Sequence, residues 1–212
     1  MKKIVLTVMA ALSLVLTSCF STGYGNTGYG TTSSSSSTGN VLGSVLGSVL
    51  GNILLGGMSL DQSSLLGNWT YSAPSAAFTT EQAFTSAGGA TAIKQIASGL
   101  ASNYATMGIS SQNTSFSFLQ GNKFSAKVNG IPFNGTYTYN QQNGEIVLKS
   151  SDQTIKGNVA KTETGIELMF DAGQMTNMLK KVGKVSNAAA VQAVNKLAKS
   201  QNGARVGFAL TK

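Results

Sequence analysis

The sequence predicts a mainly β domain, an eight-stranded antiparallel barrel that carries additional helices. Between residues 59 and 212 the chain holds eight short runs in which apolar and polar residues alternate, as half-buried strands require. Short polar segments such as Asn129-Gly130 separate many of these runs, and connections of that length join antiparallel neighbours. Because closure of the sheet removes its exposed edges, we expect a barrel rather than an open layer.

The expected strands leave room for a helical insertion after the first strand and for helices before the last. Alternation gives each strand one apolar face, which we expect to point into the barrel. An eight-stranded barrel can be filled by its own side chains or can hold one small ligand, and the sequence leaves both outcomes open. The strands are expected at 67–73, 114–119, 123–128, 135–139, 145–149, 155–160, 165–170 and 205–211. The aromatic residues of the inward face are the candidate ligand-binding residues: Phe116, Phe118, Phe124, Tyr137 and Tyr139.

Three helical patterns interrupt the strands. Thr79 begins a capping-box pattern, Gly88-Gly89 predicts a break, and apolar residues over 93–107 then recur at helical spacing. Asp171 and Ser186 are expected to begin two further helices before the last strand. We expect the apolar faces of these helices to close the barrel ends or to pack on its wall.

Cys19 follows a short apolar segment near the amino terminus. Lys2 and Lys3 precede a charge-free run over 4–16, the layout of a secretory signal peptide and too short for an ordinary membrane span. The run Leu16-Thr17-Ser18-Cys19 resembles the bacterial lipobox. That resemblance implies a lipoprotein signal peptide over 1–18 and an acylated Cys19 that anchors the chain in a membrane of the cell envelope. Phe20 stands where the inner-membrane retention signal would be Asp, so we expect the outer membrane rather than the inner one.

Residues 19–58 are expected to form a flexible tether followed by an apolar, glycine-rich repeat. Residues 21–40 contain only Ser, Thr, Gly, Asn and Tyr, so they have too little apolar area to fold. The Val-Leu-Gly repeat over 41–57 places glycines four apart, which suits close helix–helix approach. Two interpretations remain open for it: a weakly structured stretch near the membrane, or a surface for self-association or for an envelope protein partner. The folded domain is expected over 59–212.

The residue types argue against an enzyme. Histidine is absent and Cys19 is the only cysteine, so the mature chain has no imidazole, no free thiol after acylation and no internal disulfide. Glu167 stands on the opposite face of its strand from Ile166 and Leu168. We therefore expect Glu167 to point to solvent rather than to act as a general acid. We expect no catalytic residue, no metal site and no cofactor.

The mature chain is basic. Without Lys2 and Lys3 it keeps 13 of its 15 basic side chains against 7 acidic ones, a net charge near +6, and most of the basic residues lie between Lys149 and Lys212. A nucleic-acid surface is one interpretation, and attraction to anionic headgroups is another. Lysines near helix ends are favoured by the helix dipole, and an exported, tethered protein rarely meets nucleic acid. We therefore expect no nucleic-acid partner.

Several motifs of the domain carry a family resemblance. Leu66-Gly67-Asn68-Trp69 on the first strand resembles the Gly-x-Trp signature of lipocalin-like barrels. In that family the tryptophan lies at the closed end and an arginine packs across its ring, which implies that Arg205 closes the barrel together with Gly67 and Trp69. More closely, the chain resembles bacterial lipoproteins with a lipocalin-like domain of unknown function. The residues that carry this closer resemblance are Leu66–Pro74, Asn113–Phe116, Gly135–Tyr137 and Phe170–Ala172.

The expected function is non-catalytic binding of a small apolar or amphiphilic molecule inside the barrel of a lipid-anchored envelope protein. An inward face with several aromatic rings and tyrosine hydroxyls offers an apolar pocket with a few polar groups. The alternative is an accessory interaction lipoprotein that docks on another envelope component through its surface or through residues 41–57.

Overall fold

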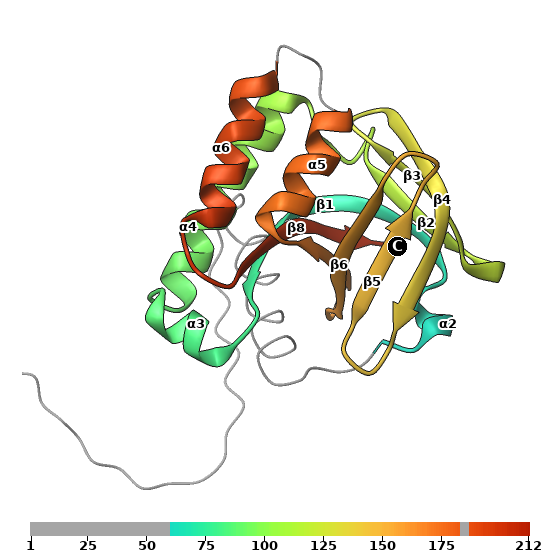
Figure 1. The fold of residues 1–212 in the computed structure, drawn as a ribbon, viewed down its shortest axis with the longest axis horizontal. Coiled ribbons are helices and arrows are strands. Elements are labelled where there is room, and N and C mark those ends of the chain that lie inside the picture. The colour runs from blue at the N-terminus through green and yellow to red at the C-terminus, as the bar shows by residue number, and fades with distance from the viewer. Residues whose placement is uncertain (1–59, 183–186) are drawn as a thin grey trace, which may run out of the picture. The chain divides into compact units, whose positions relative to one another are not determined.

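Eight antiparallel strands follow one another around a closed barrel in the computed structural model of the chain, which describes residues 60–182 and 187–212 (Figure 1). Each strand pairs with the next in the sequence, and the first closes on the last. The expected fold is therefore confirmed. The strands are β1 (Gly67–Phe78), β2 (Ser115–Leu119), β3 (Lys123–Val128), β4 (Ile131–Asn140), β5 (Glu145–Lys149), β6 (Thr154–Lys161), β7 (Gly165–Phe170) and β8 (Ala204–Thr211).

The expectations for the amino-terminal segment lie outside the described residues. They concern the signal peptide over 1–18, the acylated Cys19, and the tether and repeat over 19–58. Ser186, expected to begin a helix, also lies outside them.

Two strands, β1 and β4, are much longer than the sequence predicted. β1 continues past a register shift between Tyr71 and Ala73, a bulge that lets its second half stay paired with β8 alone. β4 begins at Ile131 rather than at residue 135 because Asn129 and Gly130 both have positive φ, 51° and 79°. Two such residues make a two-residue hairpin turn, which requires pairing to start at the residues directly beside it.

The helices lie where the sequence predicted them. The insertion after β1 contains α3 (Glu81–Ser86) and α4 (Ala90–Met107), and α5 (Ala172–Val182) and α6 (Ala188–Lys199) precede β8. The amino-terminal cap of α3 was expected at Thr79 and is Thr80, whose Oγ1 accepts a hydrogen bond from the Ala83 N–H at 3.1 Å. Asp171 caps α5 as expected, since its Oδ1 accepts from the Gln174 N–H at 2.8 Å. A further short helix, α2 (Gln62–Leu65), precedes β1, and a 3-10 turn, η1 (Gln120–Asn122), joins β2 to β3.

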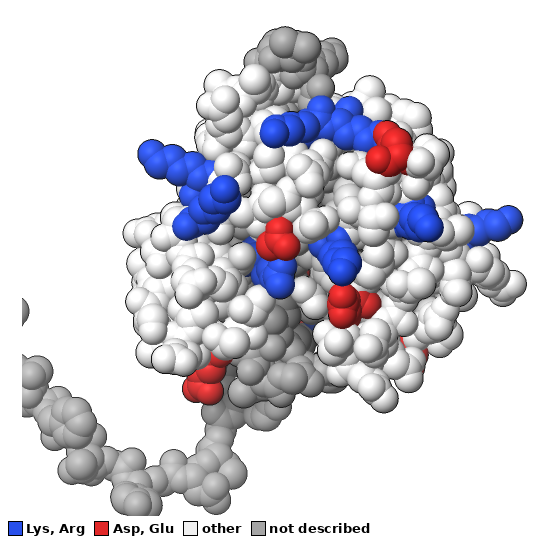
Figure 2. All heavy atoms as spheres, in the orientation of Figure 1, with Lys and Arg blue, Asp and Glu red and all other residues white. Residues whose placement is uncertain are grey.

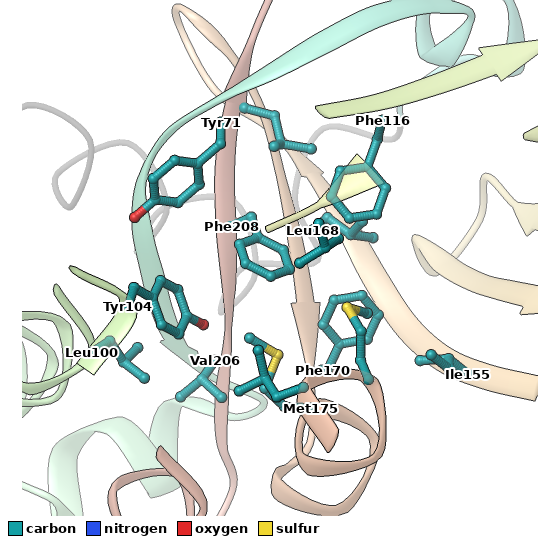
Figure 3. Close-up of a cluster of buried hydrophobic side chains, with 14 of the residues drawn as sticks. Tyr71, Leu100, Tyr104, Phe116, Ile155, Leu168, Phe170, Met175, Val206 and Phe208 are labelled. Carbon is teal, nitrogen blue, oxygen red and sulfur yellow. The ribbon is translucent and has the colours of Figure 1, made fainter. Parts of the chain in front are cut away.

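Helices α4, α5 and α6 pack together beside β1 and β8 and cover one end of the barrel (Figure 1). Tyr104 of α4 and Met175 of α5 reach the interior rings of Phe208 and Phe170 (Figure 3). The ring centres of Tyr104 and Phe208 are 5.5 Å apart, and the Tyr104 hydroxyl donates to the Gly207 carbonyl at 3.2 Å. The insertion after β1 therefore closes the barrel mouth on this side. No helix in the described ranges is long and apolar enough to cross a membrane.

Candidate ligand site inside the barrel

The five candidate ligand-binding residues all belong to the interior core or pack against it. Phe116, Phe118, Phe124 and Tyr137 are at most 3% exposed, and Tyr139 is half-buried against the same core. The rings of Phe118 and Tyr137 meet edge-to-face with centres 5.2 Å apart, a favoured aromatic geometry. Alternation along each strand was therefore sufficient to predict which side chains point inward.

Phe133 is an interior aromatic that the sequence reasoning missed. It is 2% exposed, and its ring centre lies 5.1 Å from that of Phe124. The prediction did not include Phe133 because the fourth strand was expected to begin at residue 135. The signal was present in Asn129-Gly130, since a two-residue turn would have started that strand at residue 131 and placed Phe133 on the inward side.

The hydroxyls of two interior tyrosines are buried. Neither the Tyr137 Oη nor the Tyr139 Oη has a partner of normal geometry among the described residues. Burial raises the pKa of both phenols, and the nearby Gln62 side chain and Leu60 backbone offset this rise only in part. Both hydroxyls therefore stay protonated at neutral pH and can donate to an acceptor. Buried polar groups are nearly always hydrogen-bonded, so each hydroxyl is available to a water or to an acceptor on a bound molecule.

The end of the barrel opposite α4, α5 and α6 is closed by α2 and the residues around it. Leu65 is fully buried, and its carbonyl accepts a hydrogen bond from the Trp69 Nε1–H at 2.8 Å. The Gln62 Nε2–H donates to Asn122 Oδ1 at 2.9 Å, which ties α2 to the connection between β2 and β3. These two side-chain bonds hold a helix of four residues across this end.

Lys212, rather than Arg205, lies across the tryptophan ring. The Lys212 Nζ is 4.6 Å from the centre of the Trp69 ring. Gly67 adopts a φ of 129°, and a Cβ there would lie 3.2 Å from the Lys212 Cε. The lysine stem thus packs over a glycine next to the ring, so Gly67 and Trp69 belong to the closed end as expected.

The expectation for Arg205 is wrong. β8 runs antiparallel to β1, so Arg205 at its start is paired with Ala77 near the far end of β1, whereas Thr211 is paired with Thr70 beside the tryptophan. Arg205 instead forms an ion pair with Asp171, its Nη1 lying 3.4 Å from the Asp171 Oδ2. Within β8 it is the end near Thr211, and not the start at Arg205, that lies beside the tryptophan.

The family comparison agrees with this architecture. Residues 44–212 match the family model described as Lipocalin-like domain (DUF4923). The chain belongs to this lipocalin-like family. The match covers most of the chain, including the barrel, all described helices and most of the glycine-rich repeat. The search of curated proteins found no match, and neither did the search of solved structures.

Charged groups of the lipocalin-like domain lie mainly outside the barrel. On the face shown in Figure 2 the basic side chains are spread over the surface, and several of them lie beside an acidic group. The described ion pairs include Lys181 with Asp152. Within residues 60–182 and 187–212, no group of three or more acidic, cysteine or histidine side chains is arranged to hold a metal ion.

Glu167 departs from the expectation that it points to solvent. It lies on the outer side of β7, as alternation requires, yet it is fully buried. Burial raises the pKa of its carboxyl to about 8, and the nearby Ser75 hydroxyl opposes the rise. The alternation pattern identified the face of the strand correctly but could not show that this outer face is covered.

Proposed function

We propose that this protein is a lipid-anchored envelope protein whose barrel binds one small amphiphilic molecule without transforming it. The observation that carries the proposal is the pair of buried, unpartnered hydroxyls on Tyr137 and Tyr139 beside an aromatic interior. In the proposed complex the apolar part of the ligand lies against Phe118 and Phe124. Its oxygen-bearing end accepts hydrogen bonds from the two tyrosines.

The chemistry of the site favours an amphiphile over a purely polar molecule. Aliphatic and aromatic side chains make up the interior, so binding there would be driven by removing apolar surface from water. The two phenols are neutral donors at neutral pH because burial raises the pKa of each. Neutral phenols bind and orient an acceptor such as a carbonyl, ester or carboxyl oxygen but provide no base, which supports a non-catalytic role.

The proposed anchor would hold the domain where amphiphiles are concentrated. An acylated Cys19 would keep the barrel within reach of a bilayer, and the outer membrane is the location that Phe20 favours. Stable anchoring requires more than one acyl chain, as the lipobox modification supplies. Both the lipid anchor and the envelope location are part of this proposal.

Entry of the ligand requires one covered end of the barrel to open. We assign this role to α2, because a helix of four residues held by the Trp69–Leu65 and Gln62–Asn122 hydrogen bonds is the smaller barrier. The opposite end is covered by three longer helices that share the interior core. Displacement of α2 would also expose Tyr137 and Tyr139 directly.

A fluorescent long-chain fatty acid tests the proposal by titration into the detergent-solubilised full-length protein. The wild-type chain should bind one probe molecule, and the double variant Y137F/Y139F should bind it roughly tenfold more weakly, because each lost hydrogen bond contributes about 0.5–1.5 kcal/mol. Y71F is the matched control, since it removes a phenol hydroxyl from the part of the interior that faces α4. No binding by the wild type, or equal binding by all three chains, would overturn the proposal.

A further inference from the structure

One stretch of the outer barrel surface has the composition of a core. It is formed by outward-facing residues of β1, β8, β7 and β6, which are neighbours in the closed barrel. Glu167 lies on the outer side of the barrel wall, because its strand neighbours Ile166 and Leu168 point into the interior core. We name this surface the alanine face and define it by Ser75, Ala77, Ala160, Glu167, Met169 and Ala209.

The alanine face is buried, whereas the outward side of the opposite strands is exposed. Its members are between 0% and 7% exposed. On β3, by contrast, the outward residues are Lys123, Ser125 and Lys127, all polar and all exposed. Polar residues are normal on the outer side of a small barrel, so a run of small, solvent-excluded side chains needs a cover.

The described helices do not provide that cover. Every buried residue of α2, α4, α5 and α6 belongs to the interior core. Ala77, Ala160 and Met169 form a separate apolar cluster on the other side of the sheet, to which no described helix contributes. The cover must therefore come from elsewhere.

The alanine face also contains buried polar groups. Both carboxyl oxygens of Glu167 and the Oγ of Ser75 are buried and have no hydrogen bond of normal geometry within the described part of the chain. A buried carboxyl without a partner is costly. Whatever covers the face is expected to bring hydrogen-bond donors as well as apolar side chains.

We propose that residues 41–58 of this same chain pack on the alanine face. The family match begins at residue 44 and so includes most of this segment but not the Ser-rich tether before it. A segment that belongs to the family's domain is expected to contact the fold. The alternative occupants, a second copy and a lipid surface, would not require the segment to be part of the matched domain.

The position of Leu60 indicates that residues 41–58 can reach the alanine face. Leu60 is 4% exposed and lines a groove of about 290 Å³ together with Thr162 and Gly165. Gly165 begins β7, whose third residue is Glu167, so Leu60, where the described chain begins, lies at the border of the alanine face. Eighteen residues span about 27 Å as a helix, close to the length of an eight-residue strand at about 3.3 Å per residue.

The side chains of residues 41–58 match the alanine face both in size and in the hydrogen-bond donors that they offer. Gly43, Gly47 and Gly51 lie four apart, so on a helix they form a stripe that allows close approach to a surface of alanines. Ser44, Ser48 and Asn52 directly follow these glycines and offer donors beside that stripe. One of these groups would donate to the Glu167 carboxyl, and the Val and Leu residues would flank it. The domain would then begin near residue 41, and the tether would be limited to about residues 20–40.

Thiol labelling tests this placement in the full-length protein. With Cys19 replaced by Ser, the introduced cysteine is the only thiol. S75C is expected to react with a polar maleimide at least roughly tenfold more slowly than the matched variant S125C, whose site is exposed on β3. Adding L46D/L50D should bring the rate of S75C close to that of S125C and leave S125C unchanged.

Three results would contradict the proposal. The first is fast labelling of S75C in the unaltered segment, and the second is protection that persists with L46D/L50D. The third is protection that disappears on dilution or on exchange of detergent, which would assign the cover to a second copy or to lipid. Fluorescence of Trp69 reports whether the barrel stays folded, and the milder pair L46S/L50S repeats the comparison if the aspartates disturb it. Because the ligand titration measures the interior, the two proposals can fail independently.

Discussion

Replacement of Glu167 by Gln is expected to stabilise the domain at neutral and alkaline pH. Burial raises the pKa of the folded-state carboxyl from 4.5 to about 8, against the opposing effect of Ser75. Between these two values the unfolded chain releases the proton while the folded chain retains it. The folded state therefore loses stability as the pH rises through this window. Below the window the Glu167 carboxyl is protonated in both states, so it does not change the free energy of unfolding.

The size of the effect follows from the two pKa values. Each tenfold change in proton affinity corresponds to about 1.4 kcal/mol, so a rise from 4.5 to about 8 makes the full loss about 5 kcal/mol above the window. About 3 kcal/mol of that loss has accumulated at pH 7. Gln cannot ionise, and its amide has a shape and polarity close to those of the protonated carboxyl, so the variant should avoid most of the loss.

Urea unfolding at about pH 5, 7 and 8.5 measures this difference, with the fluorescence of the single tryptophan as the signal. Wild type and E167Q should have similar free energies of unfolding at the lowest pH and should diverge as the pH rises. The exposed carboxylate of Glu163, in the turn between β6 and β7, provides the control variant E163Q, which should follow the wild type. Parallel pH profiles for wild type and E167Q, or a less stable E167Q at neutral pH, would show that burial does not raise the pKa of the Glu167 carboxyl.

Two further predictions concern the closed end of the barrel. L65A should cost about 2–5 kcal/mol of unfolding free energy, because it removes a fully buried side chain, whereas L119A, at a site 45% exposed, should change it by less than about 0.5 kcal/mol. Similar losses for both in urea unfolding would contradict the closing role of α2. K212A should change the emission of Trp69 and cost about 0.5–2 kcal/mol, while R205A should leave the emission unchanged. The opposite pattern would indicate that Arg205, and not Lys212, packs across the Trp69 ring.

The interior of the barrel could be predicted from the sequence because alternation is a local property. Once Phe116 and Phe118 are two residues apart on a strand, their common direction follows from the geometry of the pleat. The same rule placed Tyr137 and Tyr139 on the inner side of β4. Phe133 was missed only because the start of that strand was misjudged.

Long-range features could not be predicted in the same way. The position of Arg205 depends on how far β8 extends along β1, and a motif alone does not fix that register. Glu167 was assigned to the correct side of β7, but its burial depends on what covers the outer surface. Neither the register of β8 nor the burial of Glu167 has a local signal in the sequence, so both had to come from the structure.

Native mass spectrometry of the lipidated protein, released from its own membranes in mild detergent, shows whether the barrel carries a ligand. We expect a species heavier than the acylated chain by one small molecule, which is lost on denaturation and is depleted in Y137F/Y139F. A protein whose mass always equals that of the chain and its covalent lipid would contradict this expectation.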